Sequence, residues 1–123
     1  MRSVALVWCL TVLYAEEAFV SHFEYGEMLY KAPRGVACAL CHGKDGSGGV
    51  IAGYRHKGEE KTLQAPDIRQ LSFERFYKPF TSEGYKRTDI MPRYHLTKKE
   101  IRAIYDYLQA LHKQSNVKEE EDE

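Results

Sequence analysis

Two stretches of the chain carry apolar residues at helical spacing. The first predicts a helix over residues 19–31, with one face made of Phe19, Phe23, Gly26 and Tyr30. Pro33 lies just beyond it, and proline disfavours helical backbone in the residue before it. Gly26 stands within the apolar face, where glycine costs roughly 1 kcal/mol relative to alanine. A glycine at such a position is useful where a second helix has to approach closely.

The second stretch predicts the last helix of the chain. Thr97 and Glu100 have the spacing of a capping box, in which each side chain accepts a hydrogen bond from the backbone amide of the other residue. The apolar positions that follow recur at helical intervals: Ile101, Ile104, Tyr105, Leu108 and Leu111. We expect this helix to end near His112 or Lys113, because cations are favoured at a helix C-terminus.

The region between these helices predicts loops and one shorter helix. Ser72 is a suitable N-cap for a helix whose aromatic residues form a core wall: Phe73, Phe76, Tyr77 and Phe80. Residues 43–49 are rich in glycine and predict a flexible, turn-rich loop. Residues 50–63 carry many charges and predict an extended surface loop.

Residues 1–15 have the pattern of a secretory signal peptide. Arg2 is followed by an almost unbroken apolar run over residues 4–13, and Ala15 is a small residue placed just before Glu16. A membrane-spanning helix needs about 20 apolar residues, so this run is too short. We expect cleavage after Ala15 and no stable membrane insertion afterwards. An uncleaved anchor is the alternative.

The distribution of charge separates the two ends from the body of the chain. Over the 123 residues, 18 Lys and Arg balance 18 Asp and Glu, which lacks the basic excess of a nucleic-acid-binding protein. Five consecutive acids, Glu119 to Glu123, lie in a segment (residues 114–123) that predicts a disordered acidic tail, because like charges repel and bury no apolar surface. Without both ends the balance is modestly basic, which suits an acidic protein partner.

The stretch Cys38-Ala39-Leu40-Cys41-His42 carries the clearest chemistry of the sequence. The spacing C-x-x-C-H is the signature for covalent attachment of c-type haem. Two thiols at this spacing can reach the two vinyl groups along one porphyrin edge and form thioethers. The adjoining His42 would then lie under the ring, where its imidazole can bind the iron.

Three other interpretations of the cysteine pair fit less well. A thioredoxin-like redox pair follows a strand within a βαβ unit, whereas the segment before Cys38 has a helical pattern. A structural zinc site usually takes four ligands from two pairs, and the remaining cysteine, Cys9, lies in the predicted signal peptide. A simple disulfide would leave the adjoining His42 unexplained.

With these motifs the chain resembles the small monohaem class I cytochromes c of bacterial periplasms. The resemblance covers about residues 17–112 and rests on a first helix, C-x-x-C-H-G, a late Met-Pro pair and a last helix, in that order. It implies an all-α, small cytochrome c fold over residues 16–113, with three to four helices wrapped around one covalently attached haem c. It also implies that Gly26 packs against an aromatic of the last helix, for which Tyr105 and Tyr107 are the candidates.

The resemblance extends to a residue that orients the first iron ligand. In the family, a proline carbonyl accepts a hydrogen bond from the ligand imidazole, and Pro66 matches that proline. Such a bond fixes the tautomer of the histidine and increases its basicity. Pro66 also suits the first position of a helix, so both roles stay open.

A second axial ligand decides whether the iron carries electrons or binds small molecules. In the resembled family it is a methionine just before a proline and shortly before the last helix, and Met91 fits both conditions. His95 is the main rival, because it lies in the same loop. The weaker candidates are Met28, His22, His56 and His112. Hydrogen bonds to haem propionates could come from Tyr54, Tyr85, Arg93 and Tyr94.

The resemblance implies a one-electron carrier in the periplasm rather than an enzyme. It would pass electrons between redox partner proteins of a respiratory chain, with His42 and Met91 as axial ligands, and would bind no nucleic acid. One alternative is a haem-based sensor or ligand-binding protein with an open or displaceable sixth position. Another is a haem subunit that works only within a larger oxidoreductase.

Overall fold

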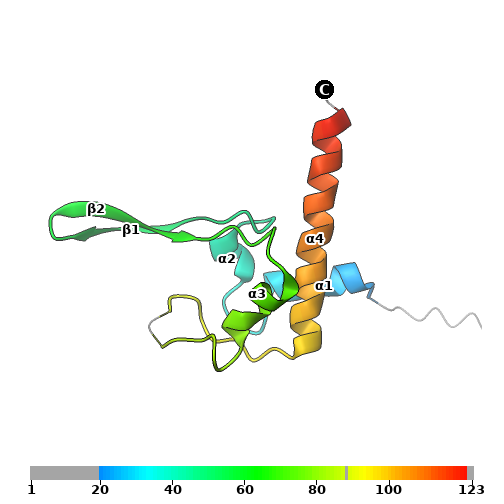
Figure 1. The fold of residues 1–123 in the computed structure, drawn as a ribbon, viewed down its shortest axis with the longest axis horizontal. Coiled ribbons are helices and arrows are strands. Elements are labelled where there is room, and N and C mark those ends of the chain that lie inside the picture. The colour runs from blue at the N-terminus through cyan, green and yellow to red at the C-terminus, as the bar shows by residue number, and fades with distance from the viewer. Residues whose placement is uncertain (1–19, 88, 122–123) are drawn as a thin grey trace, which may run out of the picture.

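The structure, a computed structural model, describes residues 20–87 and 89–121. The predicted signal peptide, residues 1–15, lies outside the described residues. Along the chain the elements are α1 (His22–Lys31), α2 (Cys38–His42), β1 (Gly49–His56), β2 (Glu59–Ala65), α3 (Phe73–Tyr77), a short 3-10 helix (Lys78–Phe80) and α4 (Lys98–Glu121). Figure 1 shows α1 and α3 against the first half of α4, with α2 between α1 and the base of the hairpin.

Helix α1 begins where a capping box satisfies its first amides. The Ser21 hydroxyl accepts from the Glu24 amide at 3.2 Å, and the Glu24 carboxylate accepts from the Ser21 amide at 3.0 Å. The helix therefore starts at His22, three residues later than the apolar pattern predicted. It ends at Lys31, as expected from the proline that follows.

Helices α1 and α4 cross, and the core lies around this crossing and α3 (Figure 1). The cap predicted for α4 is present, since Glu100 accepts from the Thr97 amide at 2.7 Å and the Thr97 hydroxyl accepts from the Glu100 amide at 3.2 Å. Ser72 caps α3 as predicted, by accepting from the Arg75 amide at 3.4 Å. The buried core residues are Leu29, Tyr30, Cys38, Phe76, Ile101, Ala103, Ile104, Tyr107 and Leu108.

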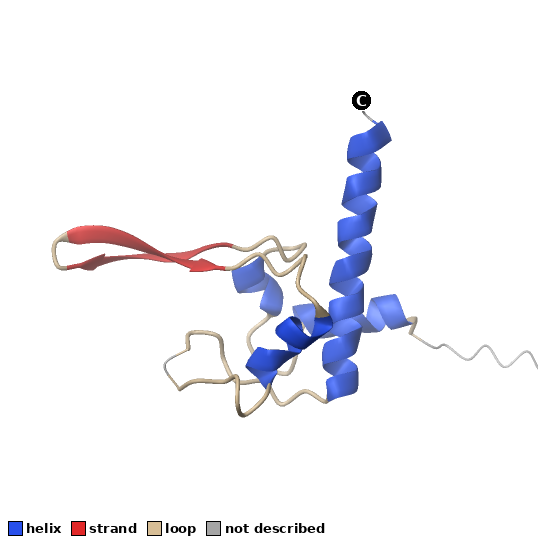
Figure 2. Ribbon diagram, viewed as in Figure 1, coloured by secondary structure: helices blue, strands red, loops and turns tan. Residues whose placement is uncertain are grey.

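Strands β1 and β2 form an antiparallel hairpin that projects from the helices (Figure 2). The all-α expectation is thus met by the helices and not by residues 50–63, which were expected to form an extended loop. The hairpin turns at Lys57 (φ 51°) and Gly58 (φ 79°). Two successive residues with positive φ form a two-residue turn whose twist matches that of the strands on either side. Every residue of β1 is exposed. Neither face of the hairpin is buried along its whole length. The sequence therefore lacks the alternation of apolar and polar residues that predicts a strand.

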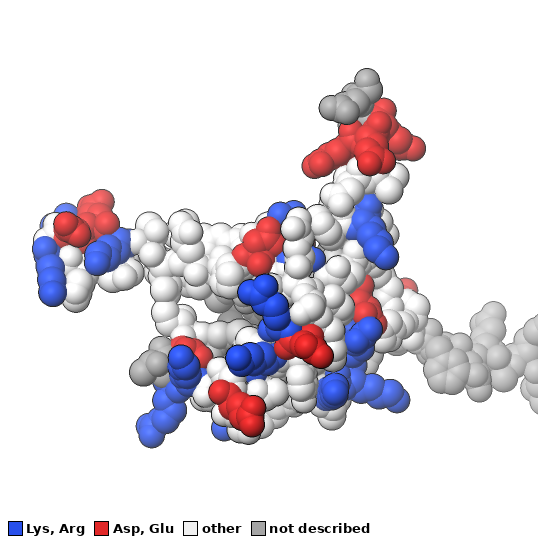
Figure 3. All heavy atoms as spheres, viewed as in Figure 1, with Lys and Arg blue, Asp and Glu red and all other residues white. Residues whose placement is uncertain are grey.

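Helix α4 continues to Glu121 rather than ending near His112 or Lys113. Residues 114–121, expected to belong to a disordered tail, are helical and exposed. The sequence from 98 to 121 contains neither glycine nor proline, and its Lys, Gln and Glu residues are good helix formers. Figure 3 shows the acidic residues gathered at this projecting end. Within the ranges 20–87 and 89–121, no helix is long and apolar enough to span a membrane.

Candidate functional site

Helix α2 presents the two cysteines and the histidine of the C-x-x-C-H motif. Cys38 is buried, whereas Cys41 and His42 are partly exposed. Because residues three and four apart lie on one side of a helix, a single turn brings all three side chains together. Leu40 points away, with 76% of its surface exposed. Both thiols are free, so the disulfide interpretation of the motif is not realised.

Burial raises the pKa of the Cys38 thiol to about 11. A reactive redox thiol needs the opposite shift, because the thiolate is the nucleophile. Cys38 also belongs to the core. These two properties argue against a thioredoxin-like pair and suit a cysteine that is held beside an apolar group.

The motif borders two adjoining cavities, of about 130 Å³ and about 370 Å³. Both are lined by Cys38, His42, Pro66, Pro79 and Met91. The larger has a size typical of ligand pockets. Its wall combines α2, the base of the hairpin and the loop before α4. The hairpin base contributes Ile51 and Leu63, which no sequence pattern had linked to the motif.

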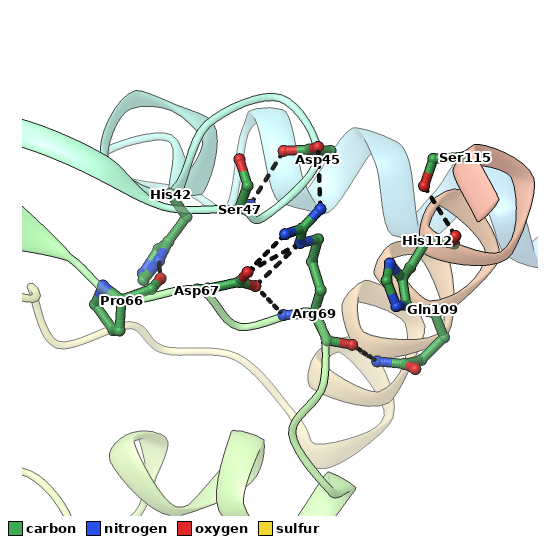
Figure 4. Close-up of polar contacts among 9 residues, drawn as sticks. All are labelled: His42, Asp45, Ser47, Pro66, Asp67, Arg69, Gln109, His112 and Ser115. Atoms are coloured by element: carbon green, nitrogen blue, oxygen red, sulfur yellow. Dashed lines mark hydrogen bonds and ion pairs between the residues drawn. The ribbon is translucent and has the colours of Figure 1, made fainter. Parts of the chain in front are cut away.

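His42 is oriented by a backbone carbonyl 24 residues further along the chain. Its Nδ1 lies 3.1 Å from the carbonyl oxygen of Pro66 (Figure 4). Since that oxygen can only accept, Nδ1 must carry the proton, and Nε2 keeps the lone pair that can bind a metal. Pro66 does not begin a helix, because β2 ends at Ala65 and α3 starts only at Phe73.

Met91 is the candidate for the second ligand that lines both cavities. His95, its main rival, is exposed and lines neither. Met28 is 57% exposed on α1. The remaining histidines lie elsewhere: His22 contacts Asp106 at 2.9 Å, His56 ends β1 and His112 is in α4.

Two tyrosines of the cavity walls are tied to the backbone. Tyr94 lines the larger cavity and donates to the Val36 carbonyl at 2.6 Å, and burial raises its pKa to about 12. Tyr30 lines the smaller cavity and donates to the Gly43 carbonyl at 2.6 Å. Tyr94 was one of four candidates for hydrogen bonds to haem propionates. The other three, Tyr54, Tyr85 and Arg93, do not line these two cavities. Arg93 instead lies over the ring of Tyr85, at 5.6 Å from its centre.

The residues present fit a flat, apolar, iron-bearing group. The cavity walls are mainly apolar, and they include the thiols of Cys38 and Cys41, the imidazole of His42 and the thioether of Met91. Haem iron accepts that pair of ligands. His42, Met91, Cys38 and Cys41 are therefore the residues that could hold a haem.

The family model described as Cytochrome c matches residues 23–112 of the chain. This segment includes α1, α2, the hairpin, α3 and the first part of α4. No curated protein and no solved structure matched the chain.

Proposed function

The chain belongs to the cytochrome c family, a family of haem-binding electron carriers, and from this premise we propose that it carries single electrons between respiratory-chain proteins in a bacterial periplasm. The observation that carries the proposal is the convergence of Cys38, His42 and Met91 on one apolar cavity. The haem supplies the one-electron couple.

The two cysteines hold the cofactor covalently in this proposal. Each thiol would add its sulfur and hydrogen across one vinyl double bond, so that two thioethers would form and no atom would be lost. Cys38 and Cys41 lie on one turn of α2, which matches two vinyl groups on one edge of the ring. The short helix would thereby hold the haem through both cysteines and keep His42 where its imidazole can bind the iron.

His42 and Met91 are the proposed axial ligands. The Pro66 carbonyl keeps the proton on Nδ1 of His42, which leaves Nε2 free to bind the iron. The Met91 thioether is a soft ligand that favours the ferrous state and raises the reduction potential. Two permanent ligands change little between oxidation states, and this small rearrangement favours fast electron transfer.

A redox titration followed by absorbance tests the proposal. We expect a reversible one-electron transition of a low-spin c-type haem, and a weak far-red charge-transfer band in the oxidised protein from the methionine ligand. Rapid CO binding by the reduced protein, without that band, would instead favour the sensor with an open sixth position. Co-purification in a stable complex would favour a subunit of a larger oxidoreductase.

The periplasmic location is proposed from residues 1–15. Expression of the full chain in a bacterium with a haem-attachment system tests it. We expect the haem protein in the periplasmic fraction with an N-terminus at Glu16. A haem protein recovered from the membrane with Met1 retained would show that the segment is an anchor.

A further inference from the structure

The glycine-rich loop between α2 and β1, which the sequence predicted to be flexible, is held against the segment after β2. The Ile68 amide donates to the Gly46 carbonyl at 2.9 Å. A Cβ built on Gly48 would lie 3.0 Å from the carbonyl oxygen of Pro66 and 2.9 Å from its carbonyl carbon. The loop therefore packs directly on the carbonyl group that accepts the hydrogen bond from His42.

The side chain of Arg69 ties the same two segments together (Figure 4). Its Nη2 donates to Oδ2 of Asp67 at 2.7 Å, its Nε donates to Oδ1 at 3.1 Å, and its backbone amide donates to Oδ1 at 2.9 Å. Its Nη1 lies 3.8 Å from Oδ2 of Asp45 in the glycine-rich loop. The hydrogen bonds from Arg69 hold the pKa of Asp67 down at about 2. Asp45, Asp67 and Arg69 form a unit, the Arg69 bracket.

The Arg69 bracket is anchored to the longest helix. The Arg69 carbonyl accepts from Nε2 of Gln109 in α4 at 2.9 Å. On the loop side, a Cβ built on Gly46 would lie 3.1 Å from Cδ2 of Leu108, a fully buried core residue. Both of the segments that the bracket joins therefore contact α4, one through the Arg69 carbonyl and the other through Gly46.

We infer that the Arg69 bracket holds the Pro66 carbonyl in place against Nδ1 of His42 and so sets the reduction potential of the protein. This inference rests on the proposed function, in which His42 is an iron ligand. The covalent link is short: the Pro66 carbonyl belongs to the peptide group whose nitrogen is that of Asp67. Clamping the Asp67 side chain and the Arg69 amide therefore fixes the plane of that carbonyl.

The expected direction follows from the basicity of the imidazole. A strong hydrogen bond from Nδ1 shifts electron density toward Nε2 and makes His42 a better donor. A better donor stabilises ferric over ferrous iron and lowers the potential. A loosened bracket weakens the hydrogen bond, so it raises the potential and exposes the Nδ1 proton to exchange with solvent.

Two variants separate this positioning role from a direct effect of charge. Asp67→Asn removes a negative charge and Arg69→Gln removes a positive charge, but both loosen the bracket. A purely electrostatic effect would raise the potential in Asp67→Asn and lower it in Arg69→Gln. We expect both to rise, with the equilibrium constant for reduction increased about two- to tenfold, where tenfold equals about 59 mV for a one-electron couple.

The measurements are the potential and the hydrogen exchange of the His42 Nδ1 proton, followed by NMR in the reduced haem protein. We expect exchange to accelerate several-fold in both variants. The matched control is Arg55→Gln, which removes the same charge from an exposed pair with Glu60 in the hairpin and should change neither quantity. Asp45→Asn, which removes the longest contact of the bracket, should shift both quantities in the same direction by less.

Shifts of opposite sign in Asp67→Asn and Arg69→Gln, or unchanged exchange of the Nδ1 proton, would overturn the inference. If both variants fail to hold haem, Asp45→Asn decides by the same two measurements. Failure of the proposed function looks different. In that case the wild-type protein itself would lack a reversible one-electron couple.

Discussion

Gly26 of α1 and Tyr107 of α4 meet where the two helices cross: a Cβ built on Gly26 would lie 2.7 Å from Cβ of Tyr107 and would collide with the carbonyl oxygen of Ala103. Tyr105, the other candidate for this contact, faces α3 instead. Its hydroxyl donates to the Leu71 carbonyl at 2.9 Å. Side chains two positions apart in a helix differ in direction by about 200°, so only one of the two tyrosines can face α1.

Gly26→Ala should therefore destabilise the protein. The added methyl group has no room at the crossing, and overpacking of this kind typically costs about 1–3 kcal/mol. Thermal unfolding of the haem-loaded protein, followed by circular dichroism, measures the loss. Gly53→Ala is the control, because nothing lies within 4 Å of its added Cβ. Equal unfolding temperatures for the two variants would show that the crossing tolerates a side chain.

The double variant Cys38→Ala with Cys41→Ala should abolish covalent haem attachment. The measurement is the amount of haem that stays with the polypeptide after denaturing gel electrophoresis. Stable folding should be lost too, because the bound group fills space that the small core leaves open. Leu40→Ala, an exposed change within the same motif, should retain bound haem. A well-folded, haem-free double variant would contradict the dependence of folding on the cofactor.

Met91→Ala should lower the reduction potential and allow the reduced protein to bind CO. The reason is the loss of the proposed soft ligand, which favours ferrous iron. His95→Ala is the matched variant in the same loop and should leave both properties nearly unchanged, since His95 is exposed and lies off the cavity walls. The reverse pattern would transfer the ligand role to His95.

Lowering the pH from about 4 to about 2 should reduce the free energy of unfolding. Hydrogen bonds from Arg69 lower the pKa of folded Asp67 to about 2, while an unfolded aspartate titrates near 3.9. The unfolded chain therefore binds the proton first as the pH falls, and the stabilisation present above pH 4 is lost. Urea unfolding at several pH values measures the slope. Asp67→Asn should flatten it, whereas Glu60→Gln in the exposed hairpin should keep the wild-type slope.

Deleting residues 114–123 should change stability little and electron transfer more. Residues 114–121 of α4 are exposed, and changes at such positions usually stay within about 0.5 kcal/mol. Loss of the acidic end leaves a more basic body, so transfer to an acidic partner should become faster and more sensitive to salt. Stopped-flow rates at several ionic strengths test this. If the rate and its salt dependence were unchanged, the acidic end would have no role in association with the partner.

The sequence predicted those features that depend on neighbouring residues. The predicted caps at Ser72 and at Thr97 with Glu100 begin helices, because capping is a local interaction between a side chain and nearby amides. The C-x-x-C-H motif is local as well, because one helical turn sets the relative positions of its thiols and its imidazole.

Local patterns failed where one part of the chain depends on a distant part. The glycine-rich loop was expected to be flexible. Instead, other segments lie so close to Gly46 and Gly48 that a side chain at either position would contact them. The hairpin and the helical extension of α4 were missed for a different reason. Residues 114–121 and most of the hairpin are exposed, so burial imposes no periodic pattern on these residues.

By itself, then, the sequence determined the family, the attachment motif and the main helices. The C-x-x-C-H spacing defines the attachment motif, and apolar residues at helical intervals predict the helices. Only the tertiary structure decided that Tyr107 meets Gly26, that Met91 rather than His95 reaches the cavity walls, and that Arg69 joins the segment of Pro66 to Asp45 of the glycine-rich loop. These are contacts between segments far apart in sequence. They depend on how side chains of different elements pack together, which no local pattern records.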